Sequence, residues 1–402
     1  MRKSNALKLS LVSLGLATAF TASANIGDDV SKAVKESKVD VSLRYRVESV
    51  DQDGVQEEAL ASTLKSRITV TTGKVSNFSA KVEADNITAI GNDSYNSTVN
   101  GVTDHAVVAD PEGSEINQAY LQYSGSFYTA TAGRQRIVLD DQRFVGGVAW
   151  RQNEQTYDGY RLQVKPVDGL TLDASYVYNV NRIFGEDSTK SDLHGDVVLV
   201  NAKYAFNKQH SVTVYNYSLE FDNAASASSN TLGATYNGKF DLGGTGLAVK
   251  VGYANQEDAG DNTTSFEASY MVAEVMAKFK SFSVGGGYEV LGSDDGDVAF
   301  STPLATLHKF QGFADKFLGT PADGIVDTYL KGATKVGPVG LSAAYHVYEA
   351  DEGNDEYGSE FNIAAGYKFN KQVSGLLKAA SYSADDYATD TTKIWLMVTA
   401  NF

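Results

Sequence analysis

The last ten residues of the chain, 393–402, follow a two-residue period that continues to the terminal residue. Successive side chains of a β-strand point to opposite faces, so one face collects five apolar residues: Ile394, Leu396, Val398, Ala400 and Phe402. A soluble protein rarely buries its final residue in such a strand. Bacterial outer-membrane barrels close on one, with apolar side chains facing out and polar ones facing in. The pattern therefore predicts a transmembrane β-barrel and disfavours an edge strand of a soluble sandwich.

The first 24 residues have the organisation of a secretory signal peptide. Arg2, Lys3 and Lys8 precede an apolar run over 9–20, and a small-residue cleavage pattern ends at Ala24. The apolar run is shorter than the roughly 20 residues that a membrane-spanning helix needs. We therefore expect a signal peptide at 1–24, a periplasmic N-terminal leader at 25–38 that is a short helix or frayed, and a barrel at 39–402.

Composition and charge narrow the function classes. The chain has no cysteine, so an exported domain must be stabilised by hydrogen-bonded sheet closure and not by disulfides. The formal net charge of −16 argues against a nucleic-acid partner. We expect partners of other kinds: outer-membrane lipid and lipopolysaccharide, small hydrophilic solutes, and the barrel-assembly machinery through the strand that ends in Phe402.

Two-residue periodicity recurs along almost the whole chain. In residues 39–47, apolar side chains alternate with polar ones that include Arg44 and Arg46, which predicts a polar barrel interior. Eighteen segments qualify as strands: 39–47, 64–72, 78–87, 116–124, 127–133, 157–165, 170–180, 195–206, 210–221, 230–240, 246–255, 265–279, 282–291, 324–334, 339–349, 359–369, 373–383 and 392–402. Sixteen strands remain an alternative, because 373–383 and 210–221 alternate poorly.

The connections between these segments alternate between short turns and longer, acidic or polar loops. Outer-membrane barrels have short periplasmic turns, longer external loops and an even number of strands. The expected all-β fold class is therefore an antiparallel transmembrane barrel of eighteen strands, integral to a Gram-negative outer membrane, with its N-terminus in the periplasm. At this size side chains cannot fill the interior, so a lumen is expected.

The segment after the fifth strand is the best candidate for a constriction. Within residues 134–143 it places three arginines and two aspartates: Arg134, Arg136, Arg143, Asp140 and Asp141. Opposed basic and acidic groups at a narrow point set the charge selectivity of a pore. The alternative is that these side chains pair with one another on an outer loop.

The inward faces of several predicted strands add a basic wall. Its members are Arg44, Arg46, Lys65, Arg67, Lys81 and Arg161. Glu83, Asp85 and Asp173 could neutralise part of this wall, yet acidic residues otherwise gather in external loops. Arginine-lined lumens attract anions and carboxylated sugars through planar hydrogen-bond donors.

Other chemistry has weaker support. The acidic loops lack the spacing of a calcium loop, so we expect them to be solvated, with divalent bridging to lipopolysaccharide as the alternative. The five histidines form no close metal-ligand pair, and no serine and histidine stand out as a nucleophile pair. We expect no enzymatic activity, no metal site and no cofactor. Trp150, Trp395 and many tyrosines are interpreted as an interfacial girdle, with sugar stacking in the lumen as the alternative.

Two stretches resemble the alginate-export-type outer-membrane porins of Gram-negative bacteria. One comprises residues 133–146 with the Trp150-Arg151-Gln152 and Tyr157-Asp158-Gly159 motifs, and the other is the segment 302–318. The resemblance implies an eighteen-stranded barrel with an arginine-rich lumen that attracts anions. It leaves the solute open, because the family includes many general porins.

Two functions are consistent with the sequence. The first is a porin-like channel for passive diffusion of small hydrophilic, anionic solutes through an arginine-lined lumen. The second is a closed barrel with a structural or adhesion role through its acidic external loops. No plug domain precedes Val39, which favours the channel.

Overall fold

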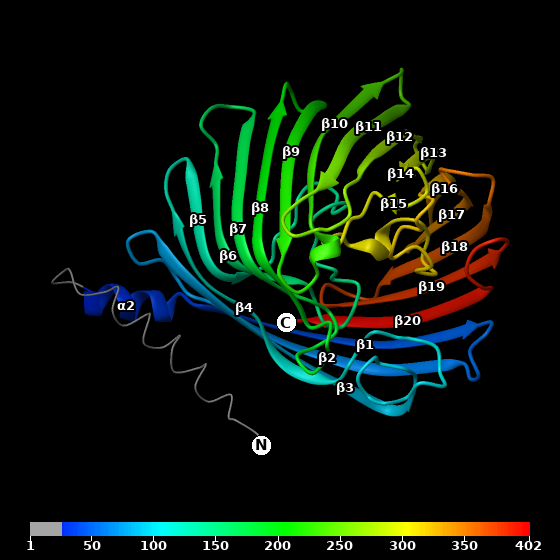
Figure 1. Ribbon diagram of the computed structural model, residues 1–402. Coiled ribbons are helices and arrows are strands. Elements are labelled where there is room, and N and C mark those ends of the chain that lie inside the picture. The colour runs from blue at the N-terminus through cyan, green and yellow to red at the C-terminus, as the bar shows by residue number, and fades with distance from the viewer. Residues whose placement is uncertain (1–25) are drawn as a thin grey trace.

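Eighteen antiparallel strands form one closed sheet in the computed structural model, which describes residues 26–402 (Figure 1). The predicted signal peptide at 1–24 lies outside these residues. The barrel strands are β1 (Lys38–Gln52), β2 (Ala59–Thr71), β3 (Phe78–Ser94), β4 (Gly113–Ser124), β5 (Tyr128–Gln135), β6 (Thr156–Val164), β7 (Leu170–Asn181), β8 (Asp192–Ala205), β9 (His210–Phe221), β10 (Ser229–Asp241), β11 (Gly246–Asp258), β12 (Glu267–Lys278), β13 (Phe282–Leu291), β16 (Ile325–Val336), β17 (Val339–Glu349), β18 (Glu356–Lys368), β19 (Val373–Ala384) and β20 (Thr391–Asn401).

The remaining elements are small. Strands β14 (Ser293–Asp294) and β15 (Val298–Ala299) pair with each other, and η1 (Ala225–Ala227) and η2 (Leu307–Lys309) are single 3₁₀ turns. Helix α2 (Ile26–Lys35) precedes the barrel, so the leader begins as a helix. Within the described residues, no helix is both long and apolar enough to cross a membrane.

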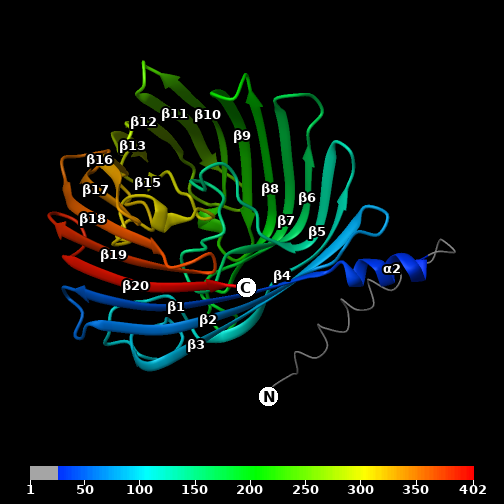
Figure 2. The same ribbon diagram turned by 180° about the vertical axis from the view of Figure 1, so that it is seen from behind.

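The first and last strands close the barrel. β1 pairs with β20 in a register that places Ser42 opposite Asn401 and Val50 opposite Lys393. The backbone groups of Val41 and Phe402 exchange hydrogen bonds of 2.8 and 3.0 Å. The eighteen predicted strands correspond one to one with the barrel strands, which rules out the alternative of sixteen. Figure 2 shows β1 and β20 side by side from behind.

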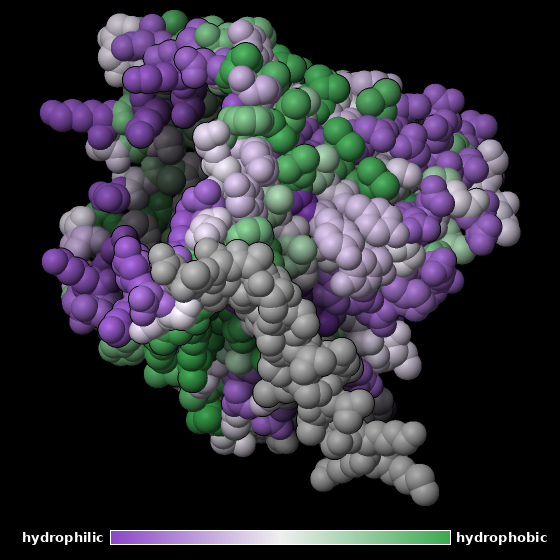
Figure 3. Space-filling view, turned by 90° about the vertical axis from the view of Figure 1, so that its left-hand side faces the viewer, coloured by the Kyte–Doolittle hydropathy of each residue, from purple (hydrophilic) through white to green (hydrophobic). Residues whose placement is uncertain are grey.

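Side chains alternate between lipid-facing and lumen-facing positions, as the terminal strand predicted. On β20, Ile394 and Leu396 are 48% and 49% exposed on the outer wall, whereas Lys393 and Trp395 face inward at 5% and 0%. Figure 3 shows hydrophobic residues gathered on the outer wall between hydrophilic margins. This apolar zone is the surface that a bilayer core requires.

The girdle interpretation, made for both tryptophans and many tyrosines, is wrong for the tryptophans and divides the tyrosines. Tyr204 is exposed beside a short turn, whereas Tyr215 is buried in the inner cluster. Trp395 is fully buried, and it packs edge-on against Trp150 with ring centroids 5.7 Å apart. Trp395 faces inward because it shares the face of β20 opposite to Ile394, and Trp150 belongs to an inward-folded loop.

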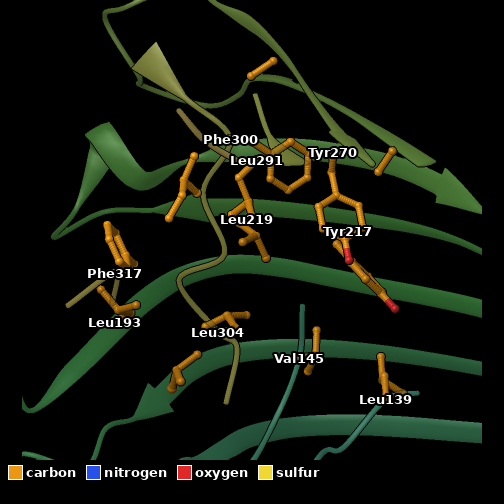
Figure 4. Packing of buried hydrophobic residues seen from close by; sticks show 14 of the residues in the cluster. Leu139, Val145, Leu193, Tyr217, Leu219, Tyr270, Leu291, Phe300, Leu304 and Phe317 are labelled. Atoms are coloured by element: carbon orange, nitrogen blue, oxygen red, sulfur yellow. The ribbon is translucent and has the colours of Figure 1, made fainter. Parts of the chain in front are cut away.

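Two long connections fold into the barrel. We call them the β5–β6 loop (residues 136–155) and the β13–β16 loop (residues 292–324). Both lie within the ring of strands in Figure 1. Their apolar residues pack on the inner wall in one buried cluster that includes Leu139, Val145, Phe300 and Leu304 against Leu219 (Figure 4). Burial of apolar surface therefore holds both loops inside.

Candidate functional site

The two inward loops bind each other across the lumen. The amide of Gly146 donates to the carbonyl of Leu304 at 2.9 Å, and the amide of Thr306 donates to the carbonyl of Gln142 at 3.0 Å. A Cβ atom at position 146 would lie 2.2 Å from Oγ1 of Thr306, so glycine is required for this approach. The hydrogen bonds join the loops into one partition inside the barrel.

A second set of contacts, which we call the loop latch, consists of Trp150, Arg151, His308 and Asp315. Nη2 of Arg151 lies 3.0 Å from Oδ2 of Asp315. The rings of Trp150 and His308 stack with centroids 4.3 Å apart and an interplanar angle of 5°. Each contact joins the β5–β6 loop to the β13–β16 loop.

His308 is neutral in the loop latch. Burial lowers its pKa to about 3, the nearby Lys378 ammonium lowers it too, and Asp315 opposes the shift only in part. Nδ1 of His308 lies 2.7 Å from Oδ1 of Asp315, and Nε2 lies 2.6 Å from Nζ of Lys378. The neutral tautomer that fits both contacts donates from Nδ1 to the carboxylate and accepts at Nε2 from the lysine.

One carboxylate, that of Glu154, binds three of the predicted wall and constriction residues: Lys65, Arg67 and Arg136. Its Oε1 lies 3.2 Å from Nζ of Lys65 and 2.9 Å from Nη2 of Arg67, and its Oε2 accepts from Nε of Arg136 at 2.7 Å. Asp85 also binds Lys65 and Arg67. Burial raises the pKa of Glu154, but the three cations outweigh burial and hold that pKa well below its ordinary value. These cations are therefore paired. Lys65 and Arg67 attach the β5–β6 loop to β2, and Arg136 attaches it to Glu83 of β3.

Arg44 and Arg46 hold the same loop from β1. Nη1 of Arg44 donates to the carbonyl of Ala149 at 2.8 Å, and Nη1 of Arg46 donates to the carbonyl of Trp150 at 2.6 Å. Arg46 also pairs with Glu48. Both arginines face inward as predicted, but their hydrogen bonds go to the loop backbone.

The other predicted site residues also have partners. Arg134 pairs with Asp158 at 2.8 Å, Arg161 with Asp173 at 2.6 Å and Arg143 with Glu289 at 3.1 Å. Lys81 lies 5.8 Å from the ring centroid of Tyr120, Asp140 accepts from Asn201 at 2.7 Å, and Asp141 pairs with Lys250 at 2.5 Å.

The predicted basic wall is thus inward-facing but largely neutralised. The sequence analysis missed Glu154 as a partner of the wall, and Asp158 and Glu289 as partners of the constriction arginines. The alternative that the constriction residues pair with one another does not hold, because most of these partners come from strands. Their role in a constriction stays a prediction.

A chamber of about 880 Å³ lies on the other side of the lumen. Its walls come from β8 to β13 and β16 to β18 with the turn at 207–209, and residues of both inward loops line it as well. Six lysines line it: Lys203, Lys208, Lys239, Lys250, Lys309 and Lys331. Its carboxylates are Asp141, Glu274, Glu289 and Asp327.

The lysines of the chamber were missed by the sequence analysis. Lys250 and Lys331 occupy inward positions between outward apolar neighbours such as Val251 and Leu330, which was a usable signal. Lys309 lies in a loop, where no periodicity reports its direction. Of the eleven predicted site residues, Asp141 is the one that lines this chamber.

Comparison with known proteins settles the family. The family model for alginate export matches residues 35–273, which is more than half of the chain. The chain belongs to the alginate export family. The matched region includes the 133–146 stretch that carried the resemblance, whereas the 302–318 segment lies beyond it. A search of curated proteins finds no match to the chain.

Solved structures share the fold of this alginate export family member. OccAB4 of Acinetobacter baumannii is 14% identical with a TM-score of 0.74, covering 91% of this chain and 98% of OccAB4. OpdL of Pseudomonas aeruginosa is 16% identical with a TM-score of 0.70, covering 92% and 99%. OpdK of the same organism, in a structure with vanillate, is 13% identical with a TM-score of 0.73, covering 92% and 99%. At 13–16% identity, these likenesses show a shared barrel fold.

Proposed function

We propose that this barrel is a passive channel for small hydrophilic anionic solutes. The observation that carries the proposal is the chamber, where six lysines face four carboxylates. A low-dielectric barrel wall focuses the field of such cations into the lumen and concentrates anions there. The basis of anion preference thus moves from the predicted arginines to lysines of the opposite wall.

The predicted arginines have a supporting part in this proposal. Arg44 and Arg46 fix the β5–β6 loop against β1, and Arg136 fixes it against Glu83 of β3. Together with Asp140 and Asp141, they would hold the loop that narrows the passage. Vanillate, which accompanies OpdK in its structure, is a carboxylate and belongs to the class of solute proposed here.

A solute series in liposomes tests the proposal. Glucuronate, glucose and glucosamine are similar in size and differ in charge, so swelling should be fastest for glucuronate and slowest for glucosamine. Replacing Lys331 with Gln should reduce the difference, whereas Lys371→Gln, in an exposed turn, is the matched control. Equal swelling with all three solutes would refute charge preference.

A closed barrel with a structural or adhesion role is the second candidate, and the loop partition favours it. Backbone hydrogen bonds and the Arg151–Asp315 pair join the two loops across the lumen. Liposomes that contain folded barrel and yet fail to swell with any of the three sugars would establish this candidate and refute the channel.

The proposal places the short turns and the N-terminus in the periplasm. An epitope inserted at 352–354, in the connection between β17 and β18, should be labelled on intact cells. An epitope in the turn at 370–372 should be labelled only after permeabilisation. The reverse pattern would invert the topology.

A further inference from the structure

Asp141 carries a carboxylate from the β5–β6 loop into the lysine-rich chamber. Its Oδ2 lies 2.5 Å from Nζ of Lys250, and its Oδ1 accepts the amide hydrogen of Arg143 at 3.2 Å. Lys309 donates from Nζ to the backbone carbonyl of Asp141 at 2.7 Å. The carboxylate therefore pairs with Lys250 of β11, and Lys309 of the β13–β16 loop binds the backbone of the same residue.

The other three carboxylates of the chamber belong to barrel strands. Glu274 is bound by Lys331 at 2.5 Å and by the Tyr329 hydroxyl at 2.6 Å. Asp327 pairs with His346 at 2.9 Å. Glu289, on β13, accepts from Tyr270 at 2.7 Å and pairs with Arg143 at 3.1 Å. Hydrogen-bonded strands hold these groups in the wall, whereas Asp141 projects from a loop.

The backbone beside Asp141 is strained. Asp140 and Gln142 have φ angles of 48° and 73°, in the left-handed region that non-glycine residues rarely adopt. Side chains fix both flanks, since Asp140 accepts from Asn201 at 2.7 Å and Gln142 accepts from the Thr306 hydroxyl at 2.7 Å. Such strain persists where the surroundings impose it, often at functional sites. Here it holds the Asp141 carboxylate toward the chamber.

We propose that Asp141 is a tethered carboxylate that occupies the binding position for solute carboxylates beside Lys250 and Lys309, and that an entering solute displaces it. The inference rests on the proposed anion channel and names the class of anion as carboxylates. No covalent step is involved, because one ion pair exchanges for another.

The charge state of Asp141 fits this role. Burial raises its pKa, but Lys250, Lys309 and the Arg143 amide outweigh burial and keep the pKa below its ordinary value. The group is therefore ionised at neutral pH and competes with any carboxylate that enters. A competitor on a short tether has an effective concentration in the millimolar range. Solute binding then stays weak enough for release, as conduction requires.

Competition in a planar bilayer tests the inference, with acetate as the probe and chloride as the current carrier. Asp141→Asn should lower the acetate concentration that halves the chloride current by several-fold to about tenfold, because the tethered competitor is removed. Asp355→Asn removes the same charge from an exposed loop outside the chamber and should leave that concentration unchanged.

A double-mutant cycle separates displacement from a general effect of charge. In a Lys250→Met background, Asp141→Asn should shift the acetate concentration far less than in the native protein, because the contested lysine is absent. Equal shifts in the two backgrounds, or no shift in either, would overturn the inference. Lys250→Met alone should raise the acetate concentration that halves the chloride current. This variant therefore tests the inference even if Asp141→Asn fails to fold.

Failure of the inference is distinguishable from failure of the proposed function. A native protein that conducts chloride and favours anions, with no effect of Asp141→Asn on acetate, refutes the tethered carboxylate alone. A native protein that conducts no ions or favours cations refutes both.

Discussion

Arg151 binds Asp315 across the lumen, with 3.0 Å between Nη2 and Oδ2. Its Nη1 also lies 3.1 Å from Oε2 of Glu48 on β1. One buried guanidinium thus joins the β5–β6 loop, the β13–β16 loop and the barrel wall. The loop partition depends on this three-way contact.

Replacing Arg151 with Ala should loosen the partition. Removing one partner of a buried pair costs about 3–5 kcal/mol, because the remaining charges are left without full compensation. We expect a lower midpoint for heat-induced unfolding and a larger, noisier single-channel current. Glu36→Gln is the control, since the Lys32–Glu36 pair is exposed and such pairs contribute little. An unchanged unfolding midpoint and an unchanged current would show that the loop latch does not hold the partition together.

The loop latch should weaken on acidification. Burial lowers the pKa of His308 to about 3, below the ordinary value near 6.5. The unfolded chain therefore binds a proton between these values while the folded chain does not. The free energy of unfolding is therefore not reduced by His308 above about pH 6.5, and it falls progressively as the pH drops toward 3.

Asp315 acts in the same direction at lower pH. Burial raises its pKa, but His308, Lys393 and Arg151 outweigh burial and hold the pKa well below the ordinary value. The ionised Asp315 carboxylate therefore stabilises the folded protein at pH values above its ordinary pKa, and this stabilisation is lost as the pH falls below that pKa. Melting temperatures measured from pH 7 to pH 4 should fall, and His308→Gln should flatten the curve. An identical curve in the variant would show that another group titrates.

Glu154 of the β5–β6 loop balances three cations, Lys65, Arg67 and Arg136. Glu154→Gln removes their shared charge partner, so we expect lower thermal stability and a reversal potential shifted toward anion selectivity. Glu352→Gln, in the exposed connection between β17 and β18, is the control. A reversal potential that responds equally to both substitutions would argue against a special position of Glu154 beside the pathway.

Strand β20 should be indispensable for assembly, because it hydrogen-bonds to β1 on one edge and to β19 on the other. Deleting residues 392–402 removes both ladders and leaves two open edges. We expect loss of the folded, heat-modifiable form in membrane fractions. Deletion of residues 26–35, which form α2 outside the sheet, should preserve that form. Normal assembly without residues 392–402 would contradict closure through the terminal strand.

The barrel was predictable because lipid on one side and a polar lumen on the other impose a two-residue period on each strand. The same two-residue period also predicts the inward position of Trp395, because Trp395 shares a strand face with Lys393 and Ile394 lies on the opposite face. The girdle interpretation relied on residue type, and strand parity would have placed the ring inside the barrel.

The loop contacts were not predictable from a local pattern. Glu154 and Asp315 lie in irregular segments, so no periodicity shows that they turn inward or which cations they meet. Counting arginines on strand faces therefore overestimated the free positive charge. Lys250 and Lys331 were within reach of the strand pattern, but isolated lysines stood out less than the cluster of charges at 134–143.

The reversal potential of the native protein in a planar bilayer under a potassium chloride gradient is the most direct test of an anion channel. At low salt we predict a potential on the anion-selective side, and near 1 M salt a weaker preference, because the screening length falls to about 3 Å. Replacing Lys250, Lys309 and Lys331 together with Gln should move the potential toward cation selectivity. Cation preference of the native protein at low salt, with no response to the three lysine substitutions, would contradict the account.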